Sequence, residues 1–279
     1  MVTINPFDVL FWTFRRNEKD TVNLYSTLSP VMQLATGGSM LNFGYWDDEC
    51  SDPISAQNNL CMIFAKMAEL ASGKNIVDVG SGLSAPSKLW SKNFPSLTLY
   101  DVNINFKQLS FSGKQKNIKF VNSTATKLPI IDNSVDRVLA LESAQHFKPL
   151  SDFIYESKRI LIKSGLLVMA IPVTLEESSF RKLGLLKFTW SSEHYGLDTV
   201  RQLVESGGFI ISEEKLIGEF VYGPLADYYI QNREFLKKSI LEKYPNYVEK
   251  ILYKSILKMK SASEKKIIDY VILKCTLKS

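Results

Sequence analysis

Cysteine, histidine and long apolar runs are scarce in this chain of 279 residues. The three cysteines, Cys50, Cys61 and Cys275, are far apart and form no CxxC pair, which argues against a structural zinc site and a disulfide framework. No apolar run approaches the roughly 18 residues that span a bilayer. Arg15 and Arg16 follow the short apolar N-terminal stretch at once, unlike the layout of a signal peptide. We therefore expect a cytoplasmic protein without a metal site.

The net charge of +5 is unevenly distributed. Residues 231–279 hold 12 Lys+Arg against 5 Asp+Glu, so the rest of the chain is slightly acidic. A basic bias this weak does not predict a nucleic-acid partner. Lys250, Lys254 and Lys258 recur at helical spacing, and they form either a solvated helix face or a contact to an anionic membrane surface or substrate. Both interpretations stay open, as does the oligomeric state.

Short apolar runs alternate with helical segments from residue 74 to the C-terminus. Strands are expected at 76–79, 97–100, 118–121, 135–141, 166–171, 209–211 and 270–274, and helices at 86–93, 106–111, 151–162 and 197–206. Strands separated by helices of this length predict a parallel, doubly wound, seven-stranded α/β sheet of Rossmann-like type.

Two further segments flank this core, which comprises residues 74–217 and 267–275. Residues 1–50 are rich in Phe, Tyr and Trp and are expected to form short helices and a loop that cover the core. A helix then begins at Asp52 and Pro53 and ends by Gly73. Residues 218–266 have the pattern of a helical insertion. We expect a single domain over residues 1–279.

The strongest local signal is the segment 77–86, Val-Asp-Val-Gly-Ser-Gly-Leu-Ser-Ala-Pro. A buried strand runs into a glycine-rich turn and a helix start, where the backbone can approach a ligand and free N–H groups are available. Asp101 ends the next strand and is placed to bind both hydroxyls of a ribose. The turn also matches the NAD pattern GxGxxG/A. Asp78 instead favours S-adenosylmethionine, whose ammonium group attracts a carboxylate that would repel a pyrophosphate.

Further segments carry a family resemblance. Residues 125–136, Ala-Thr-Lys-Leu-Pro-Ile-Ile-Asp-Asn-Ser-Val-Asp, resemble the A-x-x-L-P-F-x-D-x-S-F-D signature of class I S-adenosylmethionine-dependent methyltransferases. Residues 40–46 (Met-Leu-Asn-Phe-Gly-Tyr-Trp), 55–57 (Ser-Ala-Gln), 80–86 and 141–147 (Leu-Glu-Ser-Ala-Gln-His-Phe) follow in order. Over residues 25–215 the chain is similar to the small-molecule branch of that family. That branch includes natural-product sugar O-methyltransferases and, more distantly, sterol and tocopherol C-methyltransferases and cyclopropane-lipid synthases.

The resemblance implies a site for S-adenosylmethionine. In the family, residues at the positions of Tyr45 and Trp46 close over the cofactor, Gln57 reaches its carboxylate, and Thr124 and Ala125 flank the adenine. The implied cofactor-binding set is Tyr45, Trp46, Gln57, Asp78, Gly80, Ser81, Gly82, Asp101, Val102, Thr124, Ala125 and Glu142.

The sequence departs from the family pattern at two positions of that site. Ser84 stands where the family has a third glycine, and it is tolerated if its φ angle is negative. Thr124 stands where an aspartate accepts the adenine N6 proton; its hydroxyl is a weaker acceptor. Both departures concern the affinity for the cofactor.

His146 and Glu142 are the candidate catalytic residues. His146 follows the fourth strand at the carboxyl edge of the sheet, and a neutral imidazole can take a proton from a hydroxyl acceptor near pH 7. Glu142 would bind a substrate hydroxyl, or stabilise a carbocation if the methyl group goes to an alkene carbon.

Each of these residues also has a structural interpretation. His146 could pack or orient the substrate, and Glu142 could cap a helix. Tyr45 and Gln57 could be ordinary core and surface residues. His194, after the fifth strand, is more typical of a surface histidine.

Together these residues predict methyl transfer from S-adenosylmethionine to a small, apolar acceptor. The acceptor atom is a hydroxyl oxygen or an alkene carbon of a lipid, isoprenoid or glycoside. Residues 1–50 and 218–266 would form the acceptor pocket, with the second segment as its cap. An NAD-dependent oxidoreductase and a non-catalytic S-adenosylmethionine-binding protein are the alternatives. The chain has no YxxxK motif in the region where the oxidoreductase would need one. It also has no Asn-Pro-Pro-Tyr motif after the fourth strand, which argues against a macromolecular substrate.

Overall fold

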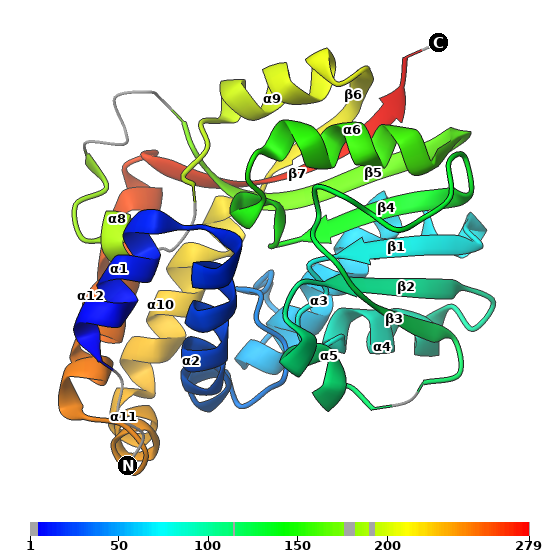
Figure 1. Ribbon diagram of the computed structural model, residues 1–279. Coiled ribbons are helices and arrows are strands. Elements are labelled where there is room, and N and C mark those ends of the chain that lie inside the picture. The colour runs from blue at the N-terminus through cyan, green and yellow to red at the C-terminus, as the bar shows by residue number, and fades with distance from the viewer. Residues whose placement is uncertain (1–4, 114, 176–181, 190–192, 279) are drawn as a thin grey trace.

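The computed structural model describes residues 5–113, 115–175, 182–189 and 193–278. Its centre is a seven-stranded sheet with helices on both faces (Figure 1). The strands are β1 (Asn75–Val79), β2 (Thr98–Asn103), β3 (Ile118–Asn122), β4 (Val135–Leu141), β5 (Leu161–Thr174), β6 (Phe209–Leu216) and β7 (Ile268–Leu277). The seven predicted strands are therefore confirmed, although β5 and β6 are longer than their apolar runs suggest.

The spatial order of the strands is β3-β2-β1-β4-β5-β7-β6. The chain winds outward from β1 to β3, returns to β4 beside β1, and then continues in the other direction. This confirms the predicted doubly wound, Rossmann-like sheet. In such a sheet the order reverses between β1 and β4, and ligands bind in the crevice outside the carboxyl ends of those strands.

β7 departs from the expected all-parallel arrangement, because it runs antiparallel to both β5 and β6. At the end of β6, Leu216 pairs with Val271, and the next amide, Ile217 N–H, donates to the Tyr270 carbonyl at 2.8 Å. The chain thus leaves β6 and enters β7 at one edge of the sheet. A strand that enters where its neighbour ends must run in the opposite direction, so the helices between them do not cross a face of the sheet.

The sheet is buried on both faces, as its apolar strands require. One face packs against α3 (Pro53–Met67) and α4 (Ala85–Asn93), through Phe64 and Trp90. The other packs against α6 (Leu150–Ile160) and α9 (Leu197–Ser206). Successive side chains of β1 point to opposite faces of the sheet. Ile76 packs in the core on the α3 and α4 side, and Val77 packs in the core on the α6 and α9 side. The short α5 (Phe106–Phe111) contacts β2 and β3.

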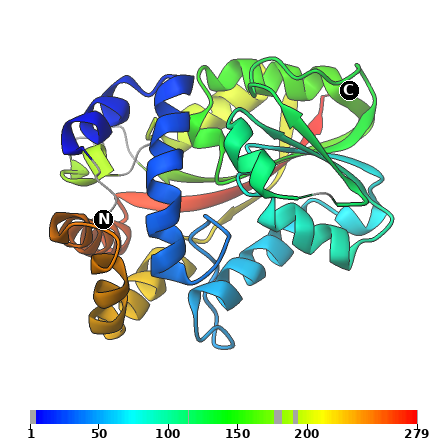
Figure 2. The same cartoon turned by 60° about the horizontal axis from the view of Figure 1, so that its bottom comes forward.

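The remaining helices lie beyond the carboxyl edge of the sheet. Two come from the N-terminal segment, α1 (Pro6–Arg15) and α2 (Glu18–Thr36), and a short α8 (Leu186–Thr189) follows β5. The residues between β6 and β7 form η3 (Gly218–Phe220), α10 (Tyr222–Gln231), α11 (Arg233–Leu241) and α12 (Asn246–Glu264). Figure 2 shows α2 standing beside the sheet, with α1 and α8 on its far side.

α2 is fixed at both ends and along its length. The Asn17 side chain caps its N-terminus by accepting from the Asp20 amide, and Gly37 ends it with a φ of 74°. Val31 packs with Ile240 of α11 and Val248 of α12. Among the described residues, no helix has the length and apolar character needed to cross a membrane.

Candidate active site

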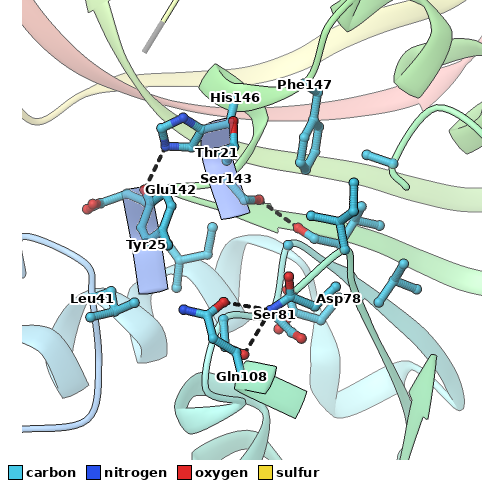
Figure 3. Close-up of a pocket in the computed structure, with 18 of the residues that line it drawn as sticks. Thr21, Tyr25, Leu41, Asp78, Ser81, Gln108, Glu142, Ser143, His146 and Phe147 are labelled. Atoms are coloured by element: carbon cyan, nitrogen blue, oxygen red, sulfur yellow. Dashed lines mark hydrogen bonds between the residues drawn. The ribbon is translucent and has the colours of Figure 1, made fainter. Parts of the chain in front are cut away.

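A pocket opens at the carboxyl edge of the sheet, where the strand order reverses. Counting its open mouth, it has an empty volume of about 1070 Å³, which is large enough for a nucleoside cofactor and part of a second molecule. The loops after β1, β2, β3 and β4 line one side of the pocket, and α2 with the segment 39–42 lines the other (Figure 3). Of the implied cofactor set, Asp78, Gly80, Ser81, Gly82, Val102, Thr124, Ala125 and Glu142 lie in the lining, together with His146.

The turn after β1 requires glycine at its first position. Gly80 has a φ of +77°, and a Cβ there would lie 2.4 Å from the Ser143 Cβ, so a side chain would displace the loop after β4. Ser84 departs from its expected conformation. Its φ is +58°, in the left-handed region, where a residue with a Cβ costs about 1–2 kcal/mol. Ser84 thus adopts a conformation that glycine reaches without this cost.

Two carboxyl groups lie buried beneath this turn. The Ser87 hydroxyl is 2.6 Å from Asp101 Oδ1 and 3.1 Å from Asp78 Oδ2, and one hydroxyl proton cannot serve both. Burial raises the pKa of Asp101 to about 6, and burial with the neighbouring Asp101 charge raises the pKa of Asp78. Asp78 lines the pocket, but Asp101 does not. Asp101 is fully buried, so its geometry does not match the predicted contact with a ribose.

Asn103 occupies the position that was expected for Asp101. It ends β2 two residues later, on the same side of the strand, and it lines the pocket. Its Nδ2 donates to the Gly82 carbonyl at 2.9 Å and to Gln108 Oε1 at 3.0 Å, which links the glycine turn to α5. Sequence reasoning chose Asp101 for its charge. The signal that would have found Asn103 is its place as the last residue of the strand.

The loop after β3 carries Thr124 and Ala125 into the pocket. The Thr124 hydroxyl bonds to the Glu18 carboxylate of α2 and lies 3.1 Å from the Thr126 hydroxyl. Glu18 was not anticipated, because the N-terminal residues matched no motif. It lines the pocket along with Thr21 and Tyr25 of the same helix.

Glu142 joins the loop after β4 to the N-terminal segment. Its Oε1 accepts from the Phe43 amide at 2.9 Å, and its backbone has a φ of +50°. Burial raises the pKa of Glu142 to about 8, and the bond from Phe43 opposes that rise. A carboxyl with this pKa is largely protonated at pH 7. The helix-capping interpretation of Glu142 is replaced by a specific contact to the backbone of the pocket wall.

His146 contacts Tyr25 in the pocket lining (Figure 3). Its Nε2 lies 2.7 Å from the Tyr25 hydroxyl, and the two rings meet edge-on with centroids 5.2 Å apart. The backbone of His146 is held by the short helix η2 (Ala144–His146) that follows β4. Burial and the nearby Glu142 charge raise the pKa of Tyr25. The phenol therefore keeps its proton at neutral pH and can donate it to the imidazole.

Besides Asp101, three predicted cofactor residues lie outside the lining and support it from behind. Gln57 is buried, and its Nε2 donates to the carbonyls of Met40 at 3.2 Å and Asn42 at 2.7 Å. Tyr45 stacks on Phe220 with centroids 4.8 Å apart. Trp46 packs against Tyr228. Their contacts hold the segment 40–46 between α3 and the helices that follow β6.

The segment 218–266 contributes no residue to the pocket lining, which differs from its expected place as the acceptor-pocket cap. Its helices pack on α2 and on the segment 40–46 instead, as the Phe43–Tyr222 ring contact at 5.8 Å illustrates. His194 also differs from expectation: it is buried, and burial lowers its pKa to about 4.

The residues present fit S-adenosylmethionine. The Ser81 hydroxyl is buried in the lining without a hydrogen-bond partner among the described residues, and such a group calls for a ligand. Asp78 lies at the same end of the pocket, and a ligand ammonium there would stabilise the ionised form of its carboxyl group. Within the described ranges, no group of three or more His, Cys, Asp or Glu side chains is arranged to hold a metal ion.

Comparison with known proteins agrees with this geometry. Residues 77–169 match the model of a methyltransferase domain. The erythromycin 3''-O-methyltransferase of Saccharopolyspora erythraea is 27% identical over 261 residues, which cover 86% of this chain and 85% of that protein. A sterol 24-C-methyltransferase of Gibberella zeae is 31% identical over 101 residues, which cover 34% of this chain and 26% of that protein.

The fold has a solved counterpart over nearly its whole length. The cyclopropane synthase MmaA2 of Mycobacterium tuberculosis superimposes with a TM-score of 0.77 at 13% identity, covering 98% of this chain and 99% of that one. A likeness at this identity concerns the architecture alone. The domain match, the relative that covers most of the chain and the pocket agree: the chain is an S-adenosylmethionine-dependent methyltransferase, similar to the class I enzymes that methylate small molecules.

Proposed function

We propose that this enzyme methylates a hydroxyl oxygen of a small, largely apolar acceptor, and that the proton released in this step is passed through Tyr25 to His146. The observation that carries the proposal is the hydrogen bond of 2.7 Å between His146 Nε2 and the Tyr25 hydroxyl, inside the pocket. A hydroxyl acceptor must lose a proton as it attacks, and an imidazole is suited to take it. The full-length relative is named as an O-methyltransferase.

The pocket residues divide between the two molecules. Asp78 and Ser81 bind the amino-acid part of the cofactor, Asn103 holds the ribose, and Ala125 lies against the base. When bound, S-adenosylmethionine supplies a methyl group on a positively charged sulfur. The chain has to hold the acceptor oxygen in line with that sulfur and remove its proton, and proximity provides much of the rate.

Proton removal follows from the Tyr25–His146 contact. The acceptor hydroxyl donates its proton to the Tyr25 oxygen while the Tyr25 hydroxyl proton moves to His146 Nε2. The bound cofactor would supply the methyl group to the acceptor oxygen and leave as neutral S-adenosylhomocysteine, so His146 would carry the positive charge afterwards. Tyr25 thus regains its proton within the same step. The raised pKa of Tyr25 fits the role of a proton relay, because Tyr25 gains one proton as it gives up another and is never left as a phenolate.

The apolar acceptor is inferred from the remaining lining. Met40, Leu41, Leu141 and Phe147 line the same pocket as Glu142 and His146. A mainly apolar wall with few polar groups selects apolar ligands and orients them by those groups. A lipid, isoprenoid or glycoside with one reactive hydroxyl fits this chemistry.

Methylation of an alkene carbon is the second candidate. Tyr25, Phe43, Tyr222 and Tyr270 lie around Glu142, and aromatic faces stabilise a carbocation. Against it, the pKa of Glu142 of about 8 leaves its carboxyl mostly neutral at pH 7, so the carboxyl adds little charge stabilisation.

The test is turnover with a set of hydroxylated and unsaturated apolar acceptors, followed as formation of S-adenosylhomocysteine and of methylated product. We expect His146→Ala to bind S-adenosylhomocysteine as the wild type does and to lose at least about 100-fold in kcat. Tyr25→Phe should lower kcat and shift its pH profile, whereas the exposed Tyr155→Phe should change neither. Full turnover by His146→Ala, or methylation at carbon only, would refute the proposal.

A further inference from the structure

The adenine end of the pocket follows from the order of the strands. A ribose bound at the end of β2 places the base one strand further out, and β3 is the next strand in that direction. Val102, Ile104 and Ala125 provide apolar surface there. The polar groups that line this end include Thr124 and Glu18.

Thr124 is poorly suited to recognise the adenine amino group. A hydroxyl has one proton, and the contact with the Glu18 carboxylate uses it. The Thr126 amide, 3.4 Å away, and the Thr126 hydroxyl, 3.1 Å away, compete for the oxygen of Thr124. The Thr124 side chain therefore orients Glu18, and the carboxylate is the strongest acceptor at this end of the pocket.

α2 places Glu18 in register with the rest of the site. Glu18, Thr21 and Tyr25 follow at i, i+3 and i+7 on one face of the helix, and all three line the pocket. Seven residues of α-helix span roughly 10 Å. One helix thus brings Glu18 to the end of β3 and Tyr25 to His146 beyond β4. Asn17 caps this helix and fixes where its first turn begins.

Building on the proposed cofactor pose, we propose that Glu18 is the residue that accepts the adenine amino group of S-adenosylmethionine. The N-terminal cover, rather than the loop after β3, then selects adenine over other bases. A carboxylate accepts from the amino group of adenine and repels the carbonyl oxygen that hypoxanthine carries at the same position. Thr124 acts as a positioning residue for this carboxylate.

The test is calorimetric titration with S-adenosylhomocysteine and with its inosine analogue, S-inosylhomocysteine. We expect the wild type to prefer the adenosine compound by tenfold or more, since a hydrogen bond to a charged group is involved. Glu18→Gln should reduce the ratio of the two affinities, because the amide of glutamine can also donate a hydrogen bond to the hypoxanthine oxygen. Glu234→Gln, an exposed acid in the first turn of α11, is the matched control and should leave both affinities unchanged.

The outcomes separate this inference from the proposed function. If the wild type binds neither compound, the cofactor site itself is refuted. If it binds the adenosine compound and Glu18→Gln keeps the full preference, only the assignment of Glu18 fails. Loss of the preference in Thr124→Val but not in Glu18→Gln would make Thr124 the direct acceptor and would also overturn the assignment. Thermal unfolding of each variant checks that it is folded.

Discussion

At the scale of single residues, chemistry identified the right places on the sheet but not always the right side chain. Asp101 and Asn103 point to the same side of β2, because side chains alternate with a period of two. Asn103 reaches the pocket because it is the last residue of β2, at the carboxyl edge of the sheet, whereas Asp101 lies two residues further inside. Ser84 shows the same limit: the sequence marked the missing glycine, but the φ of +58° is a property of the folded turn.

The buried carboxyls predict how stability depends on pH. The folded-state pKa of Glu142, about 8, is raised by burial above its ordinary value of 4.5, so the folded protein binds this proton more tightly than the unfolded chain does. The stabilisation is present below pH 4.5 and is lost as the pH rises through 8. Burial raises the pKa of Asp101 only to about 6. The stabilisation that comes from its proton is therefore mostly lost at lower pH than the stabilisation from Glu142.

We expect the free energy of unfolding of the ligand-free wild type to fall between pH 6.5 and pH 8.5, by up to about 1.4 kcal/mol per pH unit. Glu142→Gln cannot ionise and should show a smaller fall over the same interval. Urea unfolding at both pH values measures this, with the exposed Glu205→Gln as control. An equal fall in wild type and Glu142→Gln would show that the carboxyl of Glu142 is not shielded from water.

At the scale of elements, the wall of the pocket depends on a segment without regular structure. Residues 40–46 contain motifs that the sequence singled out, yet Tyr45 and Trp46 face away from the pocket toward η3 and α10. Gln57 of α3 and Glu142 after β4 hold this segment through its backbone. The contacts of residues 40–46 therefore position the backbone that forms this side of the pocket, in addition to any contact with a ligand.

Gln57→Ala should loosen this wall and weaken cofactor binding without removing a pocket side chain. Two carbonyl groups lose their donor, at about 1 kcal/mol each, so we expect a lower free energy of unfolding without ligand and about tenfold weaker binding of S-adenosylhomocysteine. Calorimetry and urea unfolding measure the two effects. Asn58→Ala, one residue along α3, is the control. Weaker binding with unchanged stability would instead mean that Gln57 contacts the cofactor directly.

At the scale of the whole molecule, α1 and α12 both contact α8. α1 exposes Phe7, Phe11 and Phe14 at i, i+4 and i+7. On α12, the sequence marked a basic stripe that includes Lys250 and Lys254, and both are exposed. Among the described residues, neither lysine forms an ion pair. Exposed aromatic residues and exposed lysines are both typical of helices that rest on an anionic membrane surface.

We expect the enzyme to sediment with vesicles that contain an anionic phospholipid, and less so at high salt. The double variant Phe7→Ser, Phe11→Ser should lose at least half of this binding, because it removes the apolar contact. The control is Phe111→Ser, an equally exposed phenylalanine on α5. Equal binding to neutral and anionic vesicles, or an unaffected double variant, would leave the basic stripe as a solvated face.

The sequence by itself determined the strands, their helical connections and the glycine turn, because apolar periodicity and turn chemistry are local properties of the chain. It also located His146, Glu142 and Asp78 at strand ends, where a doubly wound sheet forms its site. The tertiary structure alone decided that β7 is antiparallel, that Gln57 supports the pocket from behind, and that α2 brings Glu18 and Tyr25 into it. Those features depend on contacts between different elements, such as Tyr25 with His146, which are 121 positions apart in the sequence, and no local pattern encodes which of these groups will meet.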